Sequence, residues 1–123
     1  MKTAILIHSD PKAGEEALGR VFNGLAVAHN FKERGDEVKV LFLGTGTRWI
    51  AELGKPDNPV HRLFELVKDK VAGVSQGCAD VFGTTDKVKV SEFNFLNDNP
   101  IPGTAGLPSV AKLIEDGFNI LVY

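Results

Sequence analysis

The sequence contains a single cysteine, Cys78, among its 123 residues. One thiol cannot form an internal disulfide, which excludes a secreted scaffold held together by disulfides. Long apolar runs are also missing, and none approaches the length of a membrane span. The first apolar run, residues 4–7, ends at His8, too early for the apolar region of a signal peptide. We therefore expect a cytoplasmic protein that does not enter membranes.

Strong charge of either sign is missing as well. The chain has 14 Lys and Arg against 16 Asp and Glu, which gives a formal net charge of −2. No basic cluster indicates binding to nucleic acid or to an anionic membrane surface. The three histidines and the cysteine do not have the spacing of metal ligands. We expect no metal, cofactor or nucleic acid to bind.

The composition that remains is that of an ordinary globular protein, with 43% apolar and 24% charged residues. A chain of this length builds one hydrophobic core without disulfides or metals. No internal repeat, linker or low-complexity segment interrupts it. We expect a single domain over residues 1–123.

Short apolar segments alternate with helical patterns along the whole chain. Strands are expected over residues 3–7, 38–43, 71–75, 93–96 and 118–123. Helices are expected between Gly14 and Gly35, over residues 48–53 and 60–67, from Ala79 toward Lys89, and from Pro108 or Ser109 to Glu115. This order predicts a three-layer α/β/α fold with a mainly parallel five-stranded sheet, similar to flavodoxin and Rossmann folds.

Two features of this pattern leave alternatives open. Residues 84–95 alternate at Val88/Val90 and Phe93/Phe95, which also fits a longer strand. Gly19 and Gly24 lie inside the first predicted helix, where each costs about 1 kcal/mol relative to alanine. Close packing of this helix on the sheet is a hypothesis that would explain both glycines.

Polar side chains follow the first three predicted strands. Because ligands bind at the carboxyl ends of parallel strands, we expect these side chains to share one edge of the sheet. They are His8, Ser9 and Asp10 after the first strand, Thr45, Thr47 and Arg48 after the second, and Ser75, Gln76 and Cys78 after the third. This edge is the candidate site.

Cys78 is the group with the most distinctive chemistry at this edge. A thiolate is a nucleophile, and its pKa is lowered by a helix N-terminus or a nearby cation. The helix expected from Ala79 could supply the first effect, and Arg48 or Lys12 the second. Asp80 would oppose both. The alternative is that Cys78 is only a small buried apolar residue.

The other candidate residues also allow both a functional and a purely structural role. His8 could act as a general base for the thiol, or be a strand-end histidine bonded to the backbone. Thr45, Thr47 and Arg48 could bind a small anion, or form a plain turn with an exposed arginine. The glycine spacing of residues 14–19 is that of a P-loop, but two glutamates stand where the phosphate would lie, which excludes that motif.

Taken together in this order, the segments resemble the DsrE/DsrF-like family of small α/β proteins. The resemblance lies in Ile5-Leu6-Ile7-His8-Ser9, the Leu18–Phe31 helix, Val38–Gly44, Cys78-Ala79-Asp80-Val81-Phe82-Gly83 and Leu107–Phe118. It implies a parallel-sheet fold and homo-oligomers, often trimers or hexamers.

Some members of that family are sulfur-relay subunits. In these, a cysteine after the third strand carries a persulfide and passes the sulfur to a partner protein, and Cys78 falls at that position. The relay subunits have a pair of arginines before the glycine that closes this motif, whereas this chain has Val81 and Phe82. The positive charge that would stabilise a persulfide, or dock an acidic partner, is therefore missing from this motif.

Three functions follow from these observations. The first is a sulfur-carrier or sulfurtransferase-like protein in which Cys78 carries the persulfide, with His8 and Arg48 as supports. The second is a non-catalytic oligomeric binding module, which holds a small anionic ligand or a protein partner at the strand ends. Its ligand-binding residues would be Ser9, Thr45, Thr47 and Gln76. The third is an assembly subunit without a ligand.

Overall fold

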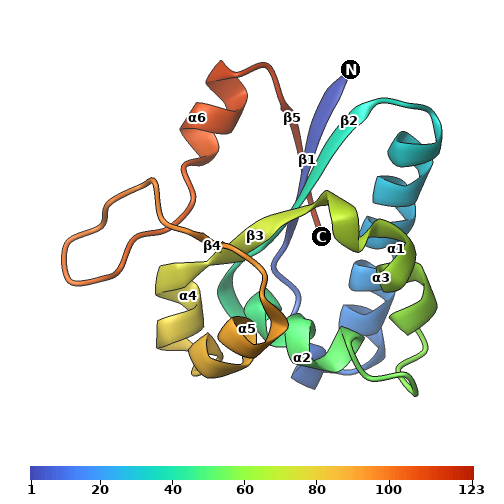
Figure 1. Cartoon of the computed structure of the whole chain (residues 1–123), viewed down its shortest axis with the longest axis horizontal. Helices are drawn as coiled ribbons and strands as arrows, with labels where there is room; N and C mark the ends of the chain where they lie inside the picture. Colours follow the sequence, from blue (N-terminus) through green and yellow to red (C-terminus); the bar gives the residue numbers. More distant parts are fainter.

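β2 (Glu37–Phe42) lies at the centre of a five-stranded sheet with the order β4-β3-β2-β1-β5 (Figure 1). The computed structural model describes residues 1–123. The other strands are β1 (Lys2–Ile7), β3 (Val71–Ser75), β4 (Phe95–Leu96) and β5 (Asn119–Val122). All neighbouring strands pair in parallel. The predicted α/β fold is confirmed; the strand order was not predicted.

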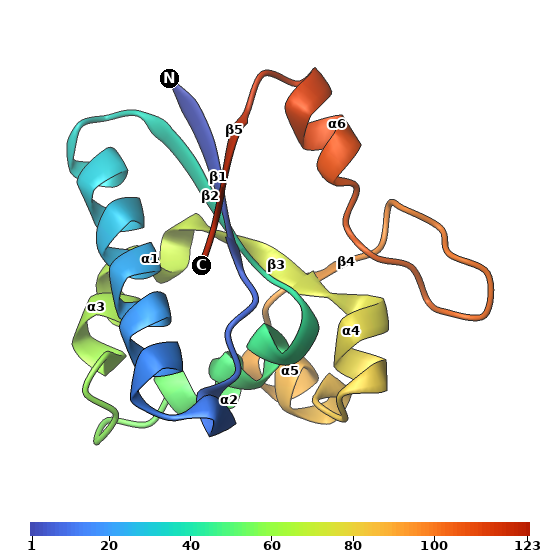
Figure 2. The ribbon, with the colours of Figure 1, turned by 180° about the vertical axis from the view of Figure 1, so that it is seen from behind.

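The helices divide unequally between the two faces of the sheet. They are η1 (Pro11–Ala13), α1 (Glu15–Glu33), η2 (Gly44–Arg48), α2 (Trp49–Leu53), α3 (His61–Val67), η3 (Lys68–Lys70), α4 (Gln76–Val81), α5 (Thr85–Ser91) and α6 (Val110–Glu115). From β1 to β4 the chain steps in one direction, so right-handed crossovers place their helices on the same face. The return to β5 places α6 alone on the other face (Figures 1 and 2). None of these helices combines the length and apolar character needed to cross a membrane.

Alternation of side chains along the strands builds a core on each face. On the first face, Ile5 and Phe42 pack with Leu25 of α1 in a cluster of 18 buried residues. On the second face the cluster has five: Ala4, Leu6, Leu41, Leu43 and Phe118. α4 sits between the clusters at the carboxyl edge, with Ala79 buried in the first and Cys78 packed against the second.

The segment 84–95 is helical and not a longer strand. α5 occupies Thr85–Ser91, and β4 contains only Phe95 and Leu96. The apparent alternation has a different cause, because Val88 is fully buried in the first cluster whereas Val90 is 85% exposed. The longer-strand alternative is therefore wrong, and the fourth strand begins two residues later than predicted.

The two helical glycines have different surroundings. A Cβ on Gly24 would lie 2.8 Å from Cδ1 of Ile7, whereas a Cβ on Gly19 would meet nothing within 4 Å. Close packing of α1 on the sheet therefore explains Gly24. It does not explain Gly19, for which the prediction is wrong.

Candidate functional site

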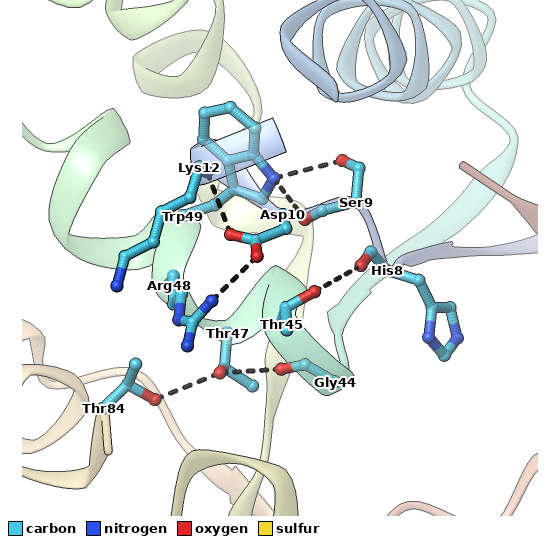
Figure 3. A network of polar contacts seen from close by, with 10 residues as sticks. All are labelled: His8, Ser9, Asp10, Lys12, Gly44, Thr45, Thr47, Arg48, Trp49 and Thr84. Carbon is cyan, nitrogen blue, oxygen red and sulfur yellow. Dashed lines mark hydrogen bonds and ion pairs between the residues drawn. The ribbon is translucent and has the colours of Figure 1, made fainter. Parts of the chain in front are cut away.

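The loops after β1 and β2 are tied together by hydrogen bonds (Figure 3). The indole Nε1–H of Trp49 donates to the Ser9 carbonyl at 2.8 Å, with Ser9 Oγ at 3.2 Å. The Thr45 hydroxyl donates to the His8 carbonyl at 3.2 Å. Close approach of the two loops also requires Gly46, since any Cβ there would overlap the Ile7 carbonyl. We call residues 8–10 with 44–49 the interlocked corner.

Asp10 and Arg48 form an ion pair in this corner, with 2.8 Å between Oδ2 and Nη1. The other carboxylate oxygen of Asp10 accepts the backbone N–H of Lys12 at 2.9 Å. The Lys12 N–H, followed by Arg48, holds the pKa of Asp10 below its ordinary value. Arg48 also lies over the Phe82 ring, 5.6 Å from its centroid. Arg48 is thus fixed from two sides.

Thr47 is fully buried within the same corner. Its hydroxyl donates to the Gly44 carbonyl at 2.9 Å and accepts from the Thr84 hydroxyl at 3.1 Å. The Ser9 hydroxyl lies 3.4 Å from the Ala17 carbonyl. The hydroxyls predicted to bind a ligand therefore all make hydrogen bonds within the protein.

His8 lies at the end of β1, but its imidazole makes no side-chain hydrogen bond. Its backbone carbonyl accepts from Thr45, and in Figure 3 the ring points away from the Asp10–Arg48 pair. Partial burial lowers the pKa of His8 below 6.5, so the ring is mostly neutral at pH 7. A neutral imidazole can accept a proton, but nothing in the structure joins this one to Cys78.

Cys78 lies in the first turn of α4 and not before it. α4 begins at Gln76, because Ser75 is its N-cap and the Ser75 hydroxyl accepts the Cys78 N–H at 3.3 Å. The prediction that this helix begins at Ala79 is therefore wrong. The serine directly before the helix was the signal that could have revealed its start.

The Cys78 thiol is free and half-buried. It packs against the second-face cluster, and no hydrogen bond joins its sulfur to another residue. The predicted supports do not contact it, since Arg48 is paired with Asp10. Gln76 is bonded to Asn97 at 2.8 Å, which ties α4 to the loop after β4. We call Ser75, Gln76 and Cys78 the thiol corner.

A cleft of about 330 Å³ opens beside the interlocked corner. Its lining is mostly polar, and we call it the cationic cleft: Pro11, Lys12, Arg48, Glu52, Phe82, Gly83, Thr84 and Lys87. Cys78 does not line it. Lys12 and Arg48 were predicted as cations of the site, whereas Lys87 and Thr84 were not predicted, because both lie in the segment 84–95, for which the pattern allowed two structures. No three His, Cys, Asp or Glu side chains converge as metal ligands anywhere in the structure.

Comparison with known proteins shows the family to which this chain belongs. The family model described as "DsrE/DsrF-like family" matches residues 1–123. The chain belongs to the DsrE/DsrF-like family. One relative, the uncharacterized protein MJ0733 of Methanocaldococcus jannaschii, is 30% identical over 121 residues, which cover 98% of this chain and 94% of that protein.

Two solved structures share the fold of this DsrE/DsrF-like chain. The conserved protein of unknown function BT1422 from Bacteroides thetaiotaomicron superposes with a TM-score of 0.66 at 21% identity, covering 99% of this chain and 94% of the other. The ychN protein from E. coli gives a TM-score of 0.55 at 14% identity, with both chains fully covered. At these identities the likeness concerns the fold alone.

Proposed function

We propose that this DsrE/DsrF-like protein is a sulfur carrier and that Cys78 holds the transferred sulfur as a persulfide. The observation that carries the proposal is the state of the thiol. It is free, half-exposed and without a hydrogen-bond partner, at the carboxyl edge of the sheet directly after β3. Buried structural cysteines are inert, whereas reactive ones are at least partly accessible.

The transfer needs no cofactor. The Cys78 thiolate attacks the outer sulfur of a donor persulfide, and the donor leaves as its thiolate. The new S–S bond on Cys78 replaces the one that breaks, so there is no net oxidation. A thiolate on the acceptor then attacks the outer sulfur and releases Cys78 as a thiolate again.

His8 and Arg48 are proposed as indirect supports for this chemistry. Arg48 contacts the ring of Phe82, which is the C-cap residue of α4. Asp10 compensates most of the charge of Arg48, so the guanidinium only partly replaces the positive charge that Val81 and Phe82 do not supply. Its influence on Cys78 is electrostatic, since no bond joins the two residues. We therefore expect a smaller effect from Arg48→Gln than from loss of the cysteine.

The proposed carrier works in the cytoplasm as a homo-oligomer, a trimer or hexamer, and hands sulfur to a relay partner. Exposed apolar side chains support an assembled state, including Val81 at 70%, Val122 at 61% and Ile114 at 59% exposure. Light scattering coupled to size-exclusion chromatography tests the assembly. A monomer at all accessible concentrations would contradict it.

Because the chain has a single cysteine, any sulfur added to a thiol must be on Cys78. After incubation with a low-molecular-weight persulfide or polysulfide, intact-mass spectrometry should show the added mass of one sulfur atom. A thiol reductant should remove it, and Cys78→Ser should prevent it. Alkylation of the untreated protein with iodoacetamide shows whether the thiol is reachable. A thiol that is alkylated but takes up no sulfur from several donors would contradict the proposal.

A further inference from the structure

We infer that the cationic cleft is a second site, which binds the phosphate group of a small phosphomonoester. The cleft is lined by three cations, Lys12, Arg48 and Lys87, against one carboxylate, Glu52. They come from η1, η2 and α5, far apart in sequence. This inference is separate from the sulfur-carrier proposal, because Cys78 does not line the cleft.

The two lysines of the cleft are unusual in having no partner. Of the 14 Lys and Arg side chains, ten form an ion pair or cation–π contact, and the four without one are Lys12, Arg62, Lys87 and Lys89. Two of these four line the same cleft. A protein that pairs most of its cations but leaves two together in a hollow has uncompensated positive charge there.

The carboxylates near the cleft are already occupied. Both oxygens of Glu52 lie within 3.2 Å of the Lys55 ammonium. Asp10 is engaged by Arg48 and by the Lys12 backbone N–H. Lys12 and Lys87 therefore remain as two positive charges, which matches a phosphomonoester dianion in charge.

Arg48 is held in place before any ligand arrives. Its Nη1 donates to Asp10 at 2.8 Å, and its guanidinium lies over Phe82. The remaining N–H groups make no hydrogen bond within the protein. Figure 3 shows the Lys12 and Arg48 side chains extending to the same side. A fixed guanidinium binds phosphate at a lower entropic cost than a mobile one.

The size of the cleft limits the ligand. A volume of about 330 Å³ is near the lower end of small-molecule sites. It accommodates a phosphate with a short carbon chain. The Phe82 ring offers an apolar wall for that chain.

Amide chemical shifts from nuclear magnetic resonance test this inference. The ¹⁵N-labelled protein is titrated with glycerol 3-phosphate and with inorganic phosphate, against sodium chloride at matched ionic strength. We expect saturable shifts at Lys12, Arg48, Gly83 and Thr84, with Kd of about 1 mM. Lys12→Gln and Lys87→Gln should each weaken binding about fivefold.

Lys89→Gln is the matched control, since Lys89 lies on the same helix as Lys87 and does not line the cleft. It should leave Kd unchanged, as should Cys78→Ser, which separates this site from the sulfur chemistry. Shifts that do not saturate, or equal weakening by Lys89→Gln, would overturn the inference. If inorganic phosphate binds but glycerol 3-phosphate does not, the assignment to a phosphomonoester is wrong.

Discussion

The interlocked corner and the thiol corner lie at the same edge of one sheet but are built differently. In the interlocked corner, Trp49, Thr45 and Arg48 each bond to the loop after β1. In the thiol corner, the Cys78 sulfur bonds to nothing. Most polar side chains of the first corner make hydrogen bonds within the protein, whereas the thiol of the second corner makes none.

This difference distinguishes residues that hold the loops together from residues with free side chains, although both kinds look alike in the sequence. Thr45 and Thr47 follow β2 in a way that resembles a ligand loop, yet their hydroxyls bond to the His8 and Gly44 carbonyls. Such bonds fix the loops against each other. The side chains without a hydrogen-bond or ion-pair partner near this edge include the Cys78 thiol, the His8 imidazole and the ammonium groups of Lys12 and Lys87.

The largest expected effect comes from forcing the interlocked corner apart with Gly46→Ala. The new Cβ would overlap the Ile7 carbonyl oxygen and lie 2.9 Å from the Ile7 carbonyl carbon and 3.2 Å from the His8 Cα. These are backbone atoms of β1 and cannot rotate away. We expect the free energy of unfolding, measured in urea, to fall by about 3 kcal/mol.

Gly19→Ala is the matched control for that variant. Gly19 lies within α1, and a Cβ there would meet nothing within 4 Å. Alanine favours a helix, so this variant should gain about 0.5–1 kcal/mol. If Gly46→Ala were as stable as the wild type, the two loops would not be as closely packed as described.

A smaller effect should distinguish the two corners directly. Trp49 is 2% exposed, and Trp49→Phe removes the donor that serves Ser9, leaving the Ser9 carbonyl unpaired and a small void. We expect a loss of about 2 kcal/mol. Cys78→Ser removes no hydrogen bond, so its cost should stay within about 1 kcal/mol. If both variants lost the same free energy of unfolding in urea, the two corners would not differ in their contribution to stability.

Much of the fold could be predicted because the strands and long helices carry a clear apolar period. The parallel sheet follows from the alternation of apolar strands and helical segments along the whole chain, and α1 follows from the apolar period of residues 18–31. Segment 84–95 was harder. Its two valines suggest a strand, and only the burial of Val88 with exposure of Val90 shows a helix. That outcome depends on tertiary packing, which a local pattern does not contain.

The sequence predicts which loops form the candidate site but does not predict the hydrogen bonds between their side chains. The rule that ligands bind at the carboxyl ends of parallel strands selected these loops, and the structure brings those after β1 and β2 together at that edge. Which hydroxyl donates to which carbonyl depends on how closely the loops approach, and Gly46 sets that distance. Lys87 lines the same cleft as Lys12 because α5 packs against α2, which is a contact between segments distant in the sequence.

The smallest expected effect is an acid sensitivity that belongs to the interlocked corner. Hydrogen bonding from Lys12, then Arg48, lowers the pKa of Asp10 below 3.8 in the folded state. The unfolded chain therefore binds this proton first, and the stabilisation from Asp10 is present above about pH 4 and lost as the pH falls through the folded pKa. In Asp10→Asn the stability lost at neutral pH should shrink steadily toward acid pH, as measured by urea unfolding. A difference between Asp10→Asn and the wild type that stays constant from neutral to strongly acidic pH would show that the Asp10 pKa is not lowered by folding.

His8 provides the contrast, since burial lowers its pKa from 6.5. The unfolded chain therefore binds this proton first, and the free energy of unfolding should already decrease as the pH falls below about 6.5. His8→Gln should remove this decrease at about pH 6 and leave the decrease below about pH 4 that belongs to Asp10.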